Sequence, residues 1–103
     1  MSGFRTMSGA IKAHKKAGGY FFSKEALDFF SGQIHHDTYQ PETGLFITSE
    51  VFGDEYLVPR TYAVRHINLD NPRRIDNVGE RHETLQQAQD ALLRAHREMV
   101  TER

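Results

Sequence analysis

The chain has 103 residues, a formal net charge of −1 at pH 7 and no cysteine. This length fits a single domain with one modest core, and the lack of thiols excludes a disulfide framework and a thiolate metal site. The seven Phe and four Tyr argue against disorder. The sequence has no apolar run of membrane-spanning length and no signal-peptide core. We therefore expect a soluble, cytoplasmic protein without a membrane partner.

The near-neutral net charge hides a segregation along the chain. Residues 1–24 contain five Lys or Arg and no acid, whereas residues 25–59 contain seven acids and no Lys or Arg. Such an asymmetry bears on partners and association rather than on fold. Two explanations stay open: the basic start folds over the acidic middle and neutralises it, or the acidic stretch binds a basic partner.

The N-terminal segment, residues 1–17, is basic and predicts a short helix. Ser8 is a suitable N-cap, and Gly18 with Gly19 is a natural stop after residues 10–17. Residues 20–22, all aromatic, then favour a short strand or an extended entry into the next helix. We assign residues 18–103 to one α+β domain.

A second short helix is predicted over residues 24–31. Ser23 is its N-cap, Glu25 lies in its first turn, and Gly32 ends it. Its apolar residues share a face at helical spacing and are predicted to be core, because a base-stacking platform would need more cations between the aromatics than Lys24 alone. These predicted core residues are Phe22, Ala26, Leu27, Phe29 and Phe30.

The middle of the chain is typical of an antiparallel sheet. Residues 41–44, Pro-Glu-Thr-Gly, predict a turn. Residues 45–52 alternate between two faces, with Phe46, Thr48 and Glu50 on one. Further strands are predicted over 60–69 and 73–80, separated by a turn at 70–72.

The C-terminal helix has the clearest pattern. Thr84 and Gln87 have the spacing of a capping box. The apolar residues that follow step by three and four, which favours packing on the sheet over a coiled coil, because two heptads are too few. The fold class is therefore α+β: a three- to four-stranded antiparallel sheet packed by a long C-terminal helix and a short helix after the first strand. The seam consists of Leu85, Ala88, Leu92, Ala95 and Met99, with Leu93 and Val100 off it.

No catalytic or metal motif emerges. His35 and His36 are adjacent, so in an extended segment they point to opposite faces and cannot easily share one ion. His66, beside Arg65 and near Glu50 on a paired strand, could form an acid–base site, but a solvated strand face explains it more simply. We predict a protein that is not an enzyme and holds no metal or cofactor.

Two binding functions remain. The first is protein docking by an acidic, aromatic segment, and the second is a small nucleic-acid-binding regulator. We expect a monomer or a weak homodimer in either case. The docking residues would be Glu50, Phe52, Asp54, Glu55 and Tyr56, and the nucleic-acid-binding residues Lys12, Lys15, Lys16, Arg65, Arg73 and Arg74.

Residues 18–95 contain a series of short motifs: an aromatic pair before S-x-E, a second aromatic pair followed by Ile-His, an F-x-T-S-E strand, a Y-x-V-R strand and a closing V-G-E before a helix. In this pattern the chain resembles a family of small phage and prophage accessory proteins. The resemblance implies a non-enzymatic protein that binds and blocks a host protein, such as a basic, nucleic-acid-handling effector of CRISPR–Cas defence. The matching residues are Phe21, Phe22, Ser23, Glu25, Phe29, Phe30, Ile34, His35, Phe46, Thr48, Ser49, Glu50, Tyr62, Val64, Arg65, Val78, Gly79 and Glu80.

Overall fold

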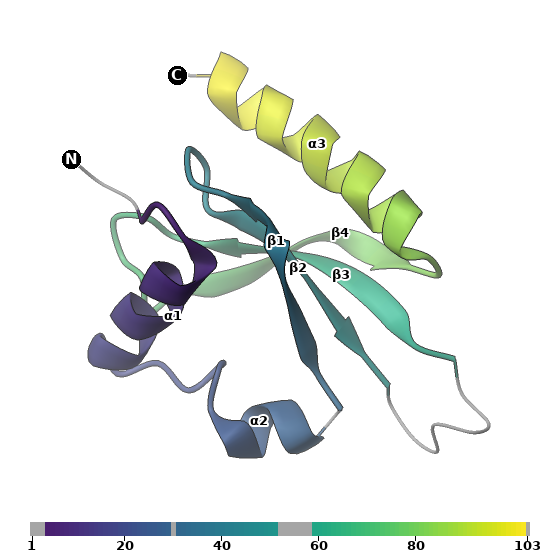
Figure 1. Ribbon diagram of the computed structural model, residues 1–103. Coiled ribbons are helices and arrows are strands. Elements are labelled where there is room, and N and C mark those ends of the chain that lie inside the picture. Colours follow the sequence, from purple (N-terminus) through teal and green to yellow (C-terminus); the bar gives the residue numbers. More distant parts are fainter. Residues whose placement is uncertain (1–3, 30, 52–58, 103) are drawn as a thin grey trace.

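The computed structural model describes residues 4–29, 31–51 and 59–102. Four antiparallel strands form one sheet in the order β1-β2-β3-β4, with α3 on one side, α1 on the other and α2 next to the start of β1 (Figure 1). The predicted α+β class is thereby confirmed. The elements are α1 (Met7–Lys16), α2 (Lys24–Phe29), β1 (Gln33–Gln40), β2 (Leu45–Glu50), β3 (Thr61–Ile67), β4 (Ile75–His82) and α3 (Leu85–Thr101).

The α3 face of the sheet is built as the sequence predicts. Thr84 caps the helix by accepting a hydrogen bond from the backbone N–H of Gln87 (3.2 Å). Ala88 and Leu92 are fully buried against the sheet, whereas Leu93 is 48% exposed. The apolar seam therefore completes a core under α3. Its buried members are Leu45, Ile47, Val64, Ala88 and Leu92, with Leu85, Ala95 and Met99 packed around them.

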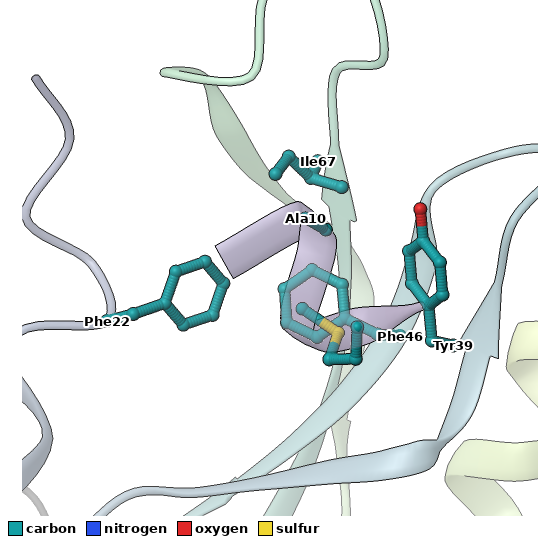
Figure 2. Close-up of a cluster of buried hydrophobic side chains, with 6 residues drawn as sticks. Ala10, Phe22, Tyr39, Phe46 and Ile67 are labelled. Carbon is teal, nitrogen blue, oxygen red and sulfur yellow. The ribbon is translucent and has the colours of Figure 1, made fainter. Parts of the chain in front are cut away.

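A second core lies on the opposite face, beneath α1. Figure 2 shows Ala10 of α1 and Phe22 meeting Phe46 and Ile67 of the sheet, with Tyr39 beside them. The Tyr39 hydroxyl donates a hydrogen bond to the Phe4 carbonyl (2.7 Å), which ties the N-terminal segment to β1. Burial raises the pKa of this phenol above its ordinary value.

The start of the chain differs in detail from the prediction. Thr6 rather than Ser8 caps α1, because its hydroxyl accepts from the backbone N–H of Gly9 (3.1 Å), and the helix begins at Met7. Residues 20–22 form a turn and not a strand. The physical reason is that the Phe21 backbone N–H donates to the ring of His14 (3.1 Å) instead of to a neighbouring strand.

The predicted burial of the second helix is wrong. Its cap at Ser23 is confirmed, since Ser23 Oγ accepts from Ala26 N–H. The helix spans Lys24–Phe29 instead of residues 24–31, and Ser31, not Gly32, has the positive φ (48°). However, no residue of α2 is buried, and Phe29 is 88% exposed. Phe22, ahead of the helix, takes the core position. Phe30 lies outside the described residues.

The predicted turn at residues 41–44 is confirmed. Gly44 has φ +85°, and a Cβ there would lie 2.3 Å from the Ile67 carbonyl oxygen, so only glycine fits. In β1 the register shifts between His35 and Gln40, where the Thr38 hydroxyl accepts the Ile47 N–H (2.9 Å). Among the described helices, none combines the length and hydropathy that crossing a membrane requires.

Candidate functional site

A buried carboxylate marks the end of β2 on the face opposite α3. Glu50 is fully buried, and its Oε1 accepts from Arg65 Nη2 (2.5 Å) and from the Thr48 hydroxyl (2.8 Å). Its Oε2 accepts from Arg81 Nη1 (2.9 Å). The contacts form because adjacent antiparallel strands place these side chains on one face. With both oxygens engaged by cations, this carboxylate is an acceptor and not a free general base.

The guanidinium of Arg65 is fixed by contacts with several side chains. It lies 5.1 Å from the centre of the Phe21 ring, donates to Thr48 and Asn77, and leaves the side chain 12% exposed. From the sequence, His66 was expected near Glu50, whereas in the structure Arg65 pairs with this carboxylate. Arg65, predicted from the sequence as a nucleic-acid-binding residue, is instead mostly buried, and each of its three guanidinium nitrogens donates to a group inside the protein.

The acid–base site that the sequence raised does not assemble. His66 follows Arg65 in β3, so its side chain is on the other face of the sheet, the face of Val64 and α3. His35 Nε2 contacts Ser49 Oγ (3.2 Å), but Ser49 is fully buried and closed to a substrate. Within residues 4–29, 31–51 and 59–102, no three His, Asp or Glu side chains are grouped as metal ligands.

The ends of the connection between β2 and β3 are firmly held. Arg60 Nη1 donates to the carbonyl of Ser31 (2.8 Å) and to the carbonyl and hydroxyl of Ser49 (3.3 and 3.2 Å). Glu50, expected as an acidic docking residue, is instead the buried anchor of this end of the sheet. The remaining docking residues predicted from the sequence lie outside the described residues. They are Phe52, Asp54, Glu55 and Tyr56.

An acidic, aromatic surface is present on α2, where sequence reasoning expected core. Glu25, Asp28 and Phe29 are all exposed. Arg60 donates to the Ser31 carbonyl just after α2, which ties the end of this helix to the start of β3. One feature of the sequence could have indicated this exposure: two acids stand among the apolar residues of a helix only six residues long. We call Glu25, Asp28 and Phe29 the α2 surface.

Basic residues from two distant segments meet at the end of α1. His14 is buried, and its Nδ1 donates to the Pro72 carbonyl (2.7 Å) in the turn between β3 and β4. This contact places Arg73 beside the last turn of α1, which contains Lys15 and Lys16. Five of the six predicted nucleic-acid-binding residues are thus exposed on two adjoining segments. They are Lys12, Lys15, Lys16, Arg73 and Arg74.

The fold and these contacts define an α+β sheet domain. Its buried polar and charged groups stabilise the fold, and its exposed acids on α2 and exposed cations at the end of α1 belong to different elements. The particular family follows from comparison. A model of a family of unknown function, DUF7447, matches residues 6–93, and the chain belongs to this family. Searches of curated proteins and of solved structures give no match.

Proposed function

We propose that this protein is a non-enzymatic binding module that docks on a basic protein partner through the α2 surface. The observation that carries the proposal is the 88% exposure of Phe29 beside two acids. An aromatic side chain that fills a pocket on a partner is the usual anchor of an interface. Carboxylates around it steer association with a positively charged partner.

The support of the α2 surface favours this function. A helix without buried residues has little packing of its own, yet Arg60 ties the end of α2 to both β2 and β3. A surface held by a rigid scaffold loses less conformational entropy on binding. Phe52, Asp54, Glu55 and Tyr56 lie between β2 and β3 in the sequence, and we propose that they also take part in docking.

The partner class follows from charge and from the resemblance in sequence. We further propose that the partner is a basic, nucleic-acid-handling effector of a bacterial host, such as a CRISPR–Cas protein, and that binding takes place in the cytoplasm. The charge supports a basic partner, whereas the phage accessory role rests on the resemblance alone. A host-defence assay addresses it: cells expressing the protein should lose interference against a targeted plasmid, and cells expressing Phe29→Ala should keep it.

The docking surface is tested by matched capture from a bacterial lysate. Wild-type protein, Phe29→Ala and the control Leu93→Ala are immobilised in parallel; Leu93 is also an exposed apolar residue, on α3. The proposal requires a protein that wild type and Leu93→Ala retain and that Phe29→Ala loses. Capture that is equal for all three variants would refute the α2 surface.

Kinetics with the captured protein separate charge from packing. Glu25→Lys with Asp28→Lys should slow association and flatten its salt dependence, because exposed charges set the rate of encounter. Phe29→Ala should instead shorten the lifetime of the complex. Asp54→Lys with Glu55→Lys applies the same test to the β2–β3 connection. An association rate that both charge reversals leave unchanged contradicts docking by acidic residues.

A further inference from the structure

The exposed side of α1 is a strip of cations. Lys12, Lys15 and Lys16 are spaced i, i+3 and i+4, so they share one helix face, and all three are exposed. The opposite face supplies Met7, Ala10 and His14 to the interior. Cations in the last turn of a helix also complement its dipole. The helix dipole therefore explains why Lys15 and Lys16 occur in the last turn. It does not explain Arg73, a cation from a distant segment that the fold places beside them.

The fold adds Arg73. His14 lies 58 residues before Pro72, and its Nδ1–H is the donor of their hydrogen bond because a carbonyl can only accept. Its Nε2 then accepts from Phe21 N–H (3.1 Å), which fixes the ring in one tautomer and one orientation. A Cβ on Gly18 would lie 4.0 Å from Arg73 Nε. The guanidinium is thereby placed against the end of α1.

The charge of this area is positive after its ion pairs are counted. Arg74 pairs with Asp76 (3.1 Å), and Asp70 is the other exposed acid of the turn. The ion pairs seen among the described residues involve Arg65, Arg74 and Arg81, and none of them includes Lys12, Lys15, Lys16 or Arg73. These four cations are therefore available to an anionic partner.

An exposed aromatic residue follows the cations of α1 in the chain. Tyr20 comes two residues after Gly18 and is 78% exposed. Cations that contact phosphates, together with an aromatic ring on which a base stacks, are the two components of single-strand binding. A membrane surface fits less well, because the apolar residues of α1 face the core and leave no apolar side to enter lipid.

We propose that Lys12, Lys15, Lys16 and Arg73 bind the backbone of a single-stranded nucleic acid and that Tyr20 stacks on one of its bases. This is a second activity, on residues distinct from the α2 surface. With four cations, binding is of the weak, sequence-independent kind, with Kd on the order of 10⁻⁴–10⁻⁶ M at physiological salt. The logarithm of the affinity should fall with that of salt with a slope of about −3, since each phosphate of a single strand contributes about −0.7.

The test uses fluorescence anisotropy with labelled 20-nucleotide oligo-dT and oligo-U and a 20-base-pair duplex, in 50 mM NaCl. The pair Lys15→Glu with Lys16→Glu should weaken single-strand binding at least tenfold. The matched control, Arg94→Glu with Arg97→Glu, makes the same change in net charge at exposed residues of α3 and should change it less than twofold. Tyr20→Ala should weaken binding by about five- to a hundredfold, the range of one stacked base.

Each result decides the proposal. Equal losses in the two charge-reversal pairs would mean attraction by net charge alone and would overturn it. An unchanged affinity in Tyr20→Ala, or tighter binding of the duplex than of the single strands, would overturn the single-strand assignment. Binding to phosphatidylglycerol-containing vesicles without binding to oligonucleotides would assign the surface to a membrane instead. Thermal melting of each variant establishes that a lost signal does not reflect unfolding.

Discussion

The face of the sheet under α3 and the face under α1 bury different kinds of side chain. Under α3, one helix packs a single apolar seam on Leu45, Ile47 and Val64. Under α1, the core draws on the N-terminal segment, α1, residues 21–22 and the sheet. It also includes the polar His14 and, further along β2, the charged Glu50. The α3 face thus depends mainly on apolar area, with a hydrogen bond between His96 of α3 and the buried Thr43 (3.0 Å), whereas the α1 face also buries a charged group.

The buried ion pairs of Glu50 make the α1 face more sensitive to single substitutions than the α3 face. Each buried polar side-chain atom in the described residues has a hydrogen-bond partner. A buried polar group that loses its partner pays the full cost of desolvation, whereas a lost apolar contact costs in proportion to its area. The comparison of the two faces therefore predicts which substitutions destabilise most and which neighbours tolerate change.

The largest effect is expected at Glu50. Glu50→Gln keeps the shape of the side chain but leaves the guanidinium of Arg65 without its counter-charge. We expect a loss of about 3–5 kcal/mol in the free energy of unfolding, measured by urea denaturation, because breaking one side of a buried pair strands the other charge. The control is Asp76→Asn, which removes the exposed pair with Arg74 and should cost less than about 1 kcal/mol. Equal effects would show that burial does not separate these pairs.

The α3 face gives the next effect. Leu92 is 2% exposed within the apolar seam, and Leu92→Ala should cost about 2–5 kcal/mol through lost burial and a residual cavity. Leu93→Ala, next in sequence on the outer side of α3, should cost less than about 1 kcal/mol. Thermal denaturation of both variants measures the difference. Similar melting temperatures for the two would contradict the placement of the seam on the sheet.

A smaller effect is expected at two glycines near α1. A Cβ on Gly19 would lie 2.1 Å from His14 Nε2, and the ring is held by Pro72 and Phe21, so Gly19→Ala should cost about 1–3 kcal/mol. Gly9→Ala meets only an ordinary contact, 3.4 Å from Thr6 Oγ1, and should stabilise the helix by about 0.5–1 kcal/mol. Opposite signs in urea denaturation are the expected result. A gain in stability for Gly19→Ala would refute the fixed position of the His14 ring.

The sequence by itself determined the elements whose causes are local. The seam of α3, its Thr84 cap, the turn at residues 41–44 and the alternation along β2 follow from helix and strand periodicity and from the conformations of Pro and Gly. These features depend on residues that are near one another in the chain. For that reason, the predicted fold class agrees with the structure.

Only the tertiary structure decided how the other face is filled. The sequence around Phe22 and the sequence around Phe29 predict burial equally well, but Phe22 is 4% exposed and Phe29 is 88% exposed. The difference arises because the hydrogen bond from Phe21 N–H to His14 places Phe22 over Phe46. From the sequence, Glu50 was predicted to be an exposed docking residue. In the structure it is buried, because β3 and β4 place Arg65 and Arg81 next to its carboxylate. Pro72 joins His14 across 58 residues. Such contacts depend on which segments the folded chain brings together, and no local pattern in the sequence records that.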